Sequence, residues 1–378
     1  MLINVIFLIF IYIHQISCTS TKDTPKKIIK AINYKLSKFR QPNMSVDGLS
    51  LSGNKPCEDK FSIFELDLGK NKKGLFLSLL DGHGGEEIAE YANLFMFPYF
   101  LEFYRNDNKE NNEDKKIVNA LEKTYERIED ELLLLAFSKK IKGEEKFSNM
   151  GSCAMTAIVY NNKIYIANLG DSKARLFSYD SYNKKYGVKK ITKTFNARKK
   201  EEQKILEKKF PNNKNIYICY NAKTCYVEGM LQPTRSFADF TLKYRIFNLP
   251  NDVINNYKKY ESEINKYQGP YINSKPDIKI INLKKTDKFL IMATDGLWDD
   301  IKSSEIKEKI DEFMKYDDTL IDVDGVSFGL LYHILDKISK NNNMSMKQLL
   351  DMEPGKKLRN IHDDITIITC DVSEYLDK

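Results

Sequence analysis

The stretch Gly74-Leu-Phe-Leu-Ser-Leu-Leu-Asp-Gly-His-Gly-Gly85 joins an apolar run to an acidic, glycine-rich turn. Residues 74–80 predict a buried strand, because the run is short and almost wholly apolar. The turn ends this strand at Asp81, and residues 86–103 then place apolar side chains on one face at helical spacing. The sequence therefore predicts a strand, a turn that carries Asp81 and His83, and a helix in succession.

The association of an apolar strand with an aspartate recurs along the chain. Further strands are predicted at residues 174–179 after Gly170-Asp171-Ser172, at 289–293 before Thr294-Asp295, and at 365–370 after His362-Asp363-Asp364. Residues 115–137 predict a second helix, and residues 154–168 a hairpin that turns at Asn161-Asn162. One Asp-Gly is a common turn signal. Recurrence at several strands predicts that carboxylates gather at one rim of a sheet structure.

A rim of carboxylates predicts a site for divalent cations. Carboxylates that lie close together repel one another unless cations compensate them. Oxygen ligands without cysteine or several histidines suit Mg²⁺ or Mn²⁺ better than zinc or copper. We therefore expect magnesium or manganese at this rim.

The composition of the 378-residue chain limits the class of protein. Apolar residues make up 42%, aromatic residues 12% and charged residues 30%, which excludes a wholly disordered, collagen-like or multi-span membrane chain. The net charge of +7 favours an anionic partner only weakly. The six cysteines lack paired C-x-x-C spacing. Cys219 and Cys225 either form a disulfide or lie reduced in the core; we favour the core, where free cysteine is common.

The N-terminal region predicts targeting rather than domain structure. Residues 1–18 are interpreted as a signal peptide or leader, because the apolar stretch is short for a membrane span and small residues follow it. An uncleaved anchor is the alternative. Residues 19–50 are rich in lysine and predict a basic linker or a transit segment. Asn43-Met-Ser45 and Asn343-Met-Ser345 are glycosylation sequons if the chain enters the secretory route.

Five motifs appear in a fixed order: Glu58-Asp59, Asp81-Gly-His-Gly-Gly85, Gly170-Asp-Ser172, Asp295-Gly-Leu-Trp-Asp299 and Asp363-Asp-Ile-Thr-Ile367. In this order the chain resembles the metal-dependent protein serine/threonine phosphatases of the 2C type. The resemblance implies an α+β fold, a four-layer α-β-β-α sandwich of two antiparallel sheets flanked by helices. The phosphatase domain is expected over residues 51–373, with polar insertions near 197–228 and 245–267.

The resemblance also implies a centre with at least two Mg²⁺ or Mn²⁺ ions per subunit. Asp81 is expected to bridge two ions. The carbonyl of Gly82 and Glu58 would complete one site, and Asp295 and Asp363 would hold the other. Two such ions can activate a shared water for in-line attack on a phosphoryl group, so that no phosphoenzyme is needed.

Three more residues take roles through the same resemblance. Asp59 is expected to orient ligands or water, and Asp171 to help bind a third, weaker ion. His83 is similar to the family's general acid, which protonates the departing serine or threonine oxygen and can contribute roughly 10²–10⁴-fold in rate. The implied function is hydrolysis of phosphoserine and phosphothreonine in proteins.

Finer motifs resemble the pyruvate dehydrogenase phosphatase branch. They are Asn54-Lys-Pro-Cys-Glu-Asp-Lys60, Leu231-Gln-Pro-Thr-Arg-Ser-Phe237 and Gly269-Pro-Tyr-Ile272. Asn54 stands where many family members have an arginine that holds substrate phosphate. Its amide donates hydrogen bonds but carries no charge, so a lysine such as Lys55 or Lys60 is expected to assist.

Three other positions depart from the family pattern. Cys153 replaces a threonine or alanine, and Thr194-Phe-Asn-Ala197 keeps only part of an Asp-His-Asn motif. Ala238 replaces a glycine, which disfavours a positive φ if one is required there.

Two other functions stay open from the sequence. A metal-dependent phosphodiesterase or nuclease would use the same cations, but the lysine runs lie in the insertions and the leader, so no nucleic acid is expected. A non-catalytic binding protein on the same fold is suggested by Asn54 and Ala238. The expected partner is a phosphoprotein substrate. The chain is expected to be a monomer, without stable membrane insertion unless the leader stays uncleaved.

The signals for location conflict. The leader predicts the secretory pathway or an organelle reached through it, whereas the branch resemblance suggests a mitochondrion. We favour the leader, because it is not of the arginine-rich amphipathic type that matrix import uses.

Overall fold

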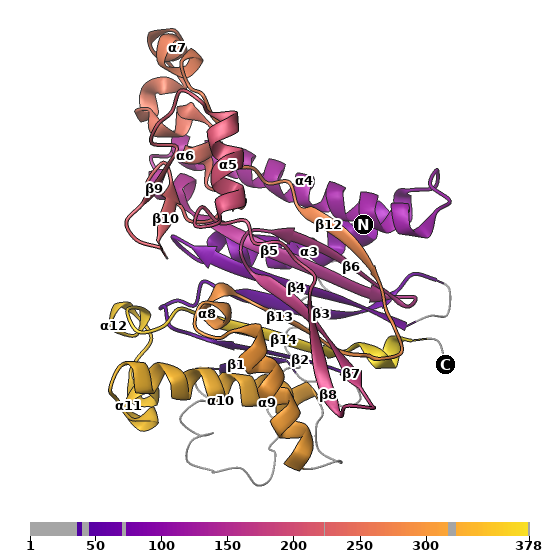
Figure 1. Cartoon of the computed structure of the whole chain (residues 1–378). Helices are drawn as coiled ribbons and strands as arrows, with labels where there is room; N and C mark the ends of the chain where they lie inside the picture. The colour runs from indigo at the N-terminus through magenta and orange to yellow at the C-terminus, as the bar shows by residue number, and fades with distance from the viewer. Residues whose placement is uncertain (1–35, 40–44, 70–72, 223, 317–322, 377–378) are drawn as a thin grey trace.

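The strand predicted at residues 74–80 lies at the centre of one of two sheets. The computed structural model describes residues 36–39, 45–69, 73–222, 224–316 and 323–376 (Figure 1). The strand extends over Lys73–His83 as β4. Leu75 and Leu77 pack in the core between the sheets, whereas Phe76 and Leu80 pack against helices on the opposite face. Both faces of β4 are buried, which explains its apolar sequence without polar alternation.

The sheet around β4 contains the predicted hairpin. Its order is β12-β6-β5-β4-β3, with β11 paired to β5. The strands are β3 (Lys60–Asp67), β5 (Gly151–Tyr160), β6 (Lys163–Leu169), β11 (Phe237–Ala238) and β12 (Asp277–Asn282). Asn161 and Asn162 turn the hairpin as predicted, with φ of 50° and 60°. Two consecutive positive φ values are the geometry that matches strand twist in a two-residue turn.

The second sheet combines strands from both ends of the chain. Its order is β1-β2-β14-β13-β7-β8. The strands are β1 (Leu36–Phe39), β2 (Val46–Leu51), β7 (Lys173–Asp180), β8 (Lys185–Lys190), β13 (Asp287–Ala293) and β14 (Ile365–Asp371). All neighbouring pairs in both sheets are antiparallel.

The folded part begins earlier than residue 51, where the sequence analysis placed it. β2 is buried along its whole length, and it pairs with β14 from Val46 opposite Cys370 to Leu51 opposite Ile365. Residues 46–50 are therefore sheet residues and not linker: the strand is paired and buried, and Val46 and Leu49 pack in the core.

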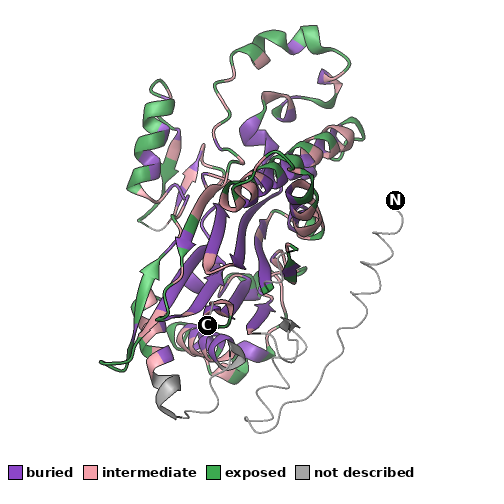
Figure 2. Ribbon diagram, turned by 90° about the vertical axis from the view of Figure 1, so that its right-hand side faces the viewer, coloured by how far each residue is buried: buried purple, intermediate pink, exposed green. Residues whose placement is uncertain are grey.

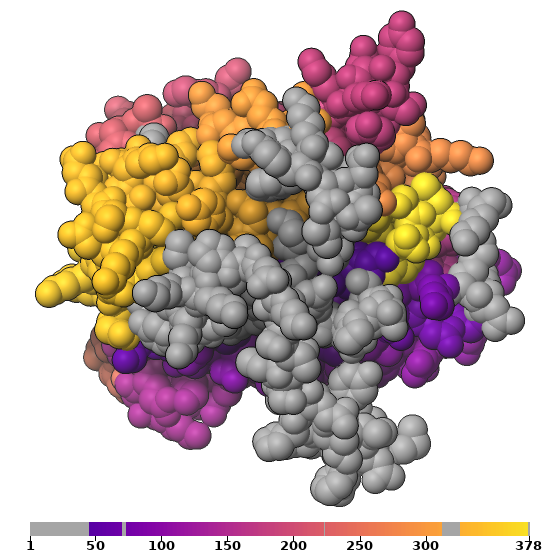
Figure 3. All heavy atoms as spheres, turned by 90° about the horizontal axis from the view of Figure 1, so that it is seen from below, coloured from indigo at the N-terminus to yellow at the C-terminus, as the bar shows by residue number. Residues whose placement is uncertain are grey.

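Helices cover the outer face of each sheet. On the β4 sheet lie α3 (Glu87–Asn106) and α4 (Glu113–Ile141). On the other sheet lie α9 (Ser303–Tyr316), α10 (Val323–Asn341), α11 (Met346–Asp351) and α12 (Lys356–Arg359). Figure 2 shows the buried strands between these layers, and Figure 3 shows the second helical layer as a broad orange and yellow surface. The predicted four-layer α-β-β-α sandwich is confirmed.

Short turns of 3₁₀ helix complete the secondary structure: η1 (Glu145–Asn149), η2 (Arg245–Asn248), η3 (Asn251–Val253) and η4 (Val372–Tyr375). Within the described residues, no helix combines the length and the apolar character that a membrane span needs. The predicted leader at residues 1–18 lies outside the described residues.

The two segments predicted as insertions contain structure of their own. The first holds α5 (Lys200–Lys209), β9 (Tyr217–Cys219) and β10 (Cys225–Val227), and the second holds α7 (Tyr257–Asn265). Each has a small apolar cluster separate from the main core. Figure 1 shows both beyond the β4 sheet, with α7 at the top of the view and β9 and β10 at the left, on the side where α8 (Asp295–Trp298) also lies.

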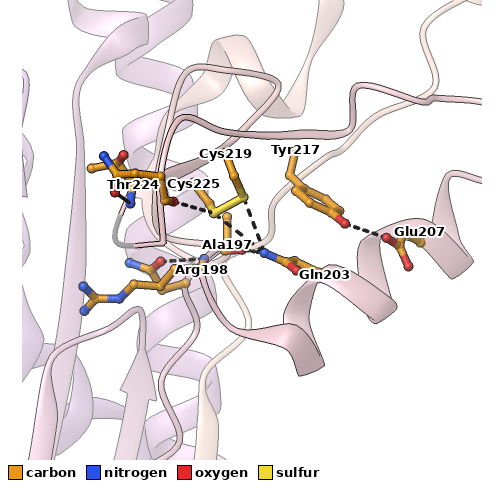
Figure 4. Close-up of a disulfide and its surroundings, with 10 residues drawn as sticks. Ala197, Arg198, Gln203, Glu207, Tyr217, Cys219, Thr224 and Cys225 are labelled. Atoms are coloured by element: carbon orange, nitrogen blue, oxygen red, sulfur yellow. Dashed lines mark hydrogen bonds between the residues drawn. A yellow bond between two sulfur atoms is a disulfide. The ribbon is translucent and has the colours of Figure 1, made fainter.

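Cys219 and Cys225 form a disulfide between β9 and β10 (Figure 4). The interpretation of both as reduced core residues was therefore wrong. Cys225 is buried, but Cys219 is exposed at the edge of the hairpin, directly opposite Cys225 in the strand register. The strand register brings their Cα atoms to 3.9 Å, inside the separation beyond which two cysteines cannot be bridged. The amide of Gln203 on α5 lies 3.6 Å and 3.7 Å from the two sulfur atoms.

A buried ion pair anchors the loop that follows β11. Glu129 on α4 lies 2.5 Å from Lys243 of α6 (Phe240–Lys243), and both side chains are at most 10% exposed. Lys243 also donates to the carbonyl of Ser236, and Glu129 accepts the backbone N–H of Ala238. The pair thus satisfies both of its charges and two backbone groups, which is the condition under which a buried ion pair is tolerated.

Replacing Lys243 by methionine is expected to destabilise the protein by roughly 3–5 kcal/mol, because Glu129 would remain buried without its partner. The double variant Lys243→Met with Glu129→Gln should recover much of this loss. Denaturant unfolding measures both. The exposed pair Lys340–Asp336 is the matched control: Lys340→Met should change stability by no more than about 1 kcal/mol. Equal effects of the two single variants would contradict the account.

Candidate metal centre

Three aspartates meet at one end of the sandwich. Asp81 lies near the end of β4, Asp171 lies in the turn between β6 and β7, and Asp295 begins α8 directly after β13 and Thr294. One carboxylate oxygen of each lies within 4.8 Å of the others. Because β4 and β13 belong to different sheets, this cluster spans the two sheets. The predicted gathering of these three carboxylates is confirmed.

Asp59 lies beneath the cluster in the core. It is 5% exposed, and its Oδ2 accepts hydrogen bonds from Thr294 Oγ1 at 3.0 Å and Thr366 Oγ1 at 2.6 Å. Thr294 directly precedes Asp295, and Thr366 lies in β14. Asp59 therefore connects the strand ends that carry the other carboxylates.

Asp364 is a site residue that sequence reasoning missed. Its carboxylate accepts the backbone N–H groups of Gly53, Asn54 and Glu58 at 2.7, 2.8 and 2.8 Å. These bonds fix the loop that carries Glu58 against the start of β14. The doubled aspartate at 363–364 was a visible signal, but the sequence does not indicate which of the two turns toward the loop.

Asn54 and Asp363 lie next to each other at the rim. The side-chain amide of Asn54 donates to Asp363 at 3.4 Å and to Asp364 at 3.1 Å. Arg359 pairs with the other oxygen of Asp363 at 2.6 Å. The Asn54 amide is thus engaged with carboxylates, rather than turned freely toward solvent.

Gly82 allows two backbone segments to approach closely. A Cβ at this position would lie 2.4 Å from the carbonyl oxygen of Glu58, which is far inside van der Waals contact. Glycine is therefore required here for steric reasons. The approach brings the Glu58 segment against the end of β4 that carries Asp81.

His83 is held by a carboxylate outside the five motifs. Its Nε2 lies 3.0 Å and 2.9 Å from the two oxygens of Asp239. Burial lowers the pKa of His83, but the negative charge of Asp239 and the hydrogen bond to it outweigh this effect and raise the pKa above its ordinary value. Gly151 makes room for the pair, because a Cβ there would lie 2.1 Å from Asp239 and 2.5 Å from His83.

The loop that carries Asp239 has left-handed backbone at two consecutive residues. Ala238 has a φ of 54° and Asp239 a φ of 49°. Positive φ is thus required at Ala238, the position that the sequence analysis identified, and it is unfavourable for residues with a Cβ. Ser236 donates to Asp239 at 2.5 Å, and Glu129 accepts from Ala238 N–H. These contacts maintain the conformation.

Asp171 has two neighbours that the sequence analysis did not assign to the site. Asn196 donates its amide to Asp171 at 2.6 Å, and the Cys153 thiol lies 3.4 Å from the other carboxylate oxygen. Asn196 is the residue that this chain retains from the Asp-His-Asn motif, and it is the residue that contacts the cluster. Burial and the nearby Asp171 and Asp81 raise the pKa of Cys153 well above its ordinary value, so the thiol stays protonated.

Without cations, burial and mutual repulsion disfavour the charged form of the carboxylates in the cluster. Burial raises the pKa values of Asp81 and Asp295 well above their ordinary range, and the charges of neighbouring aspartates raise them further. Burial also raises the pKa of Asp363 to about 6, although Arg359 opposes this. Each group would be more stable protonated or beside a cation.

The donor set fits a hard divalent cation. The three clustered ligands offer carboxylate oxygen only, and no sulfur or imidazole lies among them, which is the chemistry that Mg²⁺ and Mn²⁺ prefer. Divalent cations held there supply Lewis acidity and an activated water for phosphoryl transfer.

Comparison with known proteins gives a consistent result. Residues 47–342 match the sequence profile of the family described as protein phosphatase 2C. The chain is 27% identical over 302 residues to "Probable protein phosphatase 2C 78" of Oryza sativa subsp. japonica, covering 80% of this chain and 70% of the relative. It is 26% identical over 331 residues to "Probable protein phosphatase 2C 63" of Arabidopsis thaliana, covering 87% and 79%.

Solved structures show the same fold. A serine-threonine phosphatase 2C from Toxoplasma gondii superposes with a TM-score of 0.56 at 18% identity, over 88% of this chain and 98% of that one. A sex determining protein of C. elegans gives a TM-score of 0.59 at 15% identity, over 90% and 69%. The profile match, the relatives and the acidic centre lead to one conclusion. The chain belongs to the protein phosphatase 2C family and is a metal-dependent serine/threonine protein phosphatase.

Proposed function

We propose that the centre works with at least two Mg²⁺ or Mn²⁺ ions, and that Asp81 would supply a ligand to each of two of them. The observation that carries this proposal is the approach of Asp81, Asp171 and Asp295 to within 4.8 Å of one another. Asp295 and Asp363 would hold one ion, and the Gly82 carbonyl and Glu58 the other. Asp171 would contribute to a third, weaker site.

The remaining residues act on the substrate and on the ligands. His83 protonates the departing serine or threonine oxygen, and Asp239 keeps it charged and oriented for this step. Asp59, with its threonine partners, fixes the strand ends that carry the ligands. Asn54 contributes hydrogen-bond donors at the rim, where substrate phosphate would lie.

We propose that segments outside the two sheets select the protein substrate. The insertion near residues 197–228 lies with β9 and β10 on the same side of the molecule as α8 (Figure 1), which supports a role in substrate recognition. The insertion near residues 245–267 extends farther out and is proposed to take part in the same recognition. On the motifs around Asn54, Leu231 and Gly269, we place the chain with the pyruvate dehydrogenase phosphatase branch. We propose that it acts as a monomer.

We further propose that the chain enters the secretory pathway, or an organelle reached through it. The Cys219–Cys225 disulfide supports an oxidising compartment, because such bonds rarely persist in the cytosol. The sequon Asn343-Met-Ser345 supports the same route, since Asn343 is exposed after the end of α10.

The enzymatic proposal predicts that the full chain hydrolyses a phosphothreonine peptide with Mn²⁺ and loses this activity with a chelator. Asp295→Asn should lower kcat/KM by more than roughly 100-fold, because even partners of metal ligands cost 10–100-fold when they are changed. Asp351→Asn, the same chemical change at the exposed last residue of α11, is the control and should leave activity unchanged. Turnover that persists in chelator would contradict the two-ion mechanism.

The raised pKa values predict how stability depends on pH in the metal-free protein. The pKa of Asp363 lies at about 6 in the folded protein, above its ordinary value of 3.8. Its stabilising contribution is therefore full below 3.8 and is lost as pH rises through about 6. With chelator present, lowering the pH from about 7.5 to about 5.5 should stabilise the fold by on the order of 1 kcal/mol from this group alone.

Thermal unfolding at the two pH values measures this effect. Saturating Mn²⁺ should raise the unfolding temperature most at the higher pH, because ligands must be deprotonated to bind. Asp295→Asn should be at least as stable as the wild type in chelator, since it removes one repelling charge. A metal-free protein that is more stable at the higher pH would contradict this electrostatic account.

The proposed route predicts that the full chain, expressed in a eukaryotic secretory system, carries an N-linked glycan at Asn343. Treatment with an endoglycosidase should reduce its mass, and Asn343→Asp should abolish the glycan at that site. Asn341→Asp, an exposed change outside the sequon, is the control. Retention of the unmodified mass at Asn343 in that system would argue against entry into the pathway.

A further inference from the structure

Substrate phosphate needs a cation that position 54 does not supply. A phosphorylated side chain carries close to two negative charges at neutral pH. Asn54 is neutral and already donates to Asp363 and Asp364. Lys60, suggested by the sequence as a substitute, pairs with Glu86 and the carbonyl of Cys57. Lys55, the other lysine that the sequence suggested, is exposed at the surface. A cation held at the centre must therefore come from elsewhere.

Two cations converge on Asp299, four residues after Asp295. Arg198 forms a two-pronged contact with the Asp299 carboxylate at 2.8 Å and 2.5 Å. The Lys173 ammonium lies 3.6 Å from the same carboxylate. Two positive charges on one carboxylate leave an excess of one positive charge. The side chains of Arg198 and Lys173 are only 15% and 11% exposed, so solvent screens this charge less than at a free surface.

This cationic pair lies beside the metal centre. Lys173 follows Asp171 by two residues, and Asp299 is the C-cap residue of α8, the helix that Asp295 begins. The charges of both Asp171 and Asp295 act on Lys173 and on Arg198. Arg198 comes from the start of the first insertion, and Figure 4 shows its guanidinium pointing away from the disulfide. The insertion thus brings a cation to the carboxylate cluster.

One N–H donor of the Arg198 guanidinium has no acceptor in the described part of the structure. This donor is Nε, which is buried. The buried Ser172 hydroxyl, between Asp171 and Lys173 in the chain, likewise has no partner in the described part of the structure. A buried donor without an acceptor costs free energy unless a ligand supplies one. A phosphoryl group has the oxygen acceptors that a planar guanidinium recognises.

We propose that Arg198 and Lys173 bind the phosphoryl group of the substrate, in place of the arginine that is absent at position 54. Asp299 is the positioning residue, because its carboxylate orients the guanidinium. The proposal rests on the proposed phosphatase function of the adjacent centre. Arg198 belongs to the insertion near residues 197–228, which we also propose for recognition of the protein substrate. Binding of the phosphoryl group and recognition of the protein around it would therefore depend on the same segment.

Arg359 is the alternative cation at the rim. It pairs with Asp363 and is 47% exposed. The ion pair that its side chain forms within the described part of the chain is with a proposed metal ligand, so a bound ion would compete for its partner. Arg198 instead contacts a carboxylate outside the proposed ligand set. For this reason the geometry favours Arg198, and Arg359→Ala serves as the direct comparison.

The test uses inorganic phosphate as the probe on the full chain with saturating Mn²⁺. Calorimetry measures its affinity, and product inhibition of phosphothreonine peptide hydrolysis gives its inhibition constant. Arg198→Ala and Arg198→Gln should each weaken phosphate binding by at least roughly tenfold and raise KM more than they lower kcat. The dissociation constant for Mn²⁺ should stay the same. Lys200→Ala, which removes an exposed charge two residues away, should change none of these values.

The opposite outcomes would overturn the proposal. Equal phosphate affinity in the wild type and in both Arg198 variants, with Arg359→Ala weaker, would assign the phosphate to Arg359. A purely structural role for Arg198 would lower the unfolding temperature without changing phosphate affinity, and Arg198→Gln, which keeps a donor toward Asp299, would then behave as wild type. Failure of the phosphatase function itself would appear differently, as absence of peptide turnover in the wild type.

Discussion

Mutual repulsion of buried carboxylates is the constraint on which the rest of this structure depends. Asp81, Asp171 and Asp295 come from three separate segments of the chain, yet one carboxylate oxygen of each lies within 4.8 Å of the others. In a low-dielectric site such an arrangement is unfavourable unless positive charge is supplied. The fold therefore requires cations at these strand ends, and the same cations serve catalysis.

Hydrogen bonds and an ion pair around the centre hold these carboxylates close together despite their mutual repulsion. Asp364 binds the loop of Glu58 through backbone N–H groups, and Asp59 is tied to two threonines at the strand ends. The ion pair of Glu129 and Lys243 maintains the strained loop that holds Asp239 against His83. Stability contributed by the core thus compensates for local strain and charge, as is common at functional sites.

Much of this arrangement could be predicted from the sequence, and the limits have physical causes. The strand β4, the turn at Asn161 and the acidic motifs at the strand ends depend on local patterns, so the sequence could predict them. Asp239 was not, because it reaches its histidine partner across β5, and no local pattern encodes that pairing. β2 was assigned to a linker because its partner β14 lies at the other end of the chain. The disulfide likewise depends on hairpin register, which composition does not reveal.

Direct location of the ions tests the central claim most sharply. A crystal of the wild-type protein grown with Mn²⁺ would be measured at the manganese absorption edge. The account predicts at least two anomalous peaks at the end of the sandwich, with the Asp81 carboxylate contacting both and Asp295 contacting one. Manganese bound elsewhere, with these carboxylates left without an ion, would contradict it.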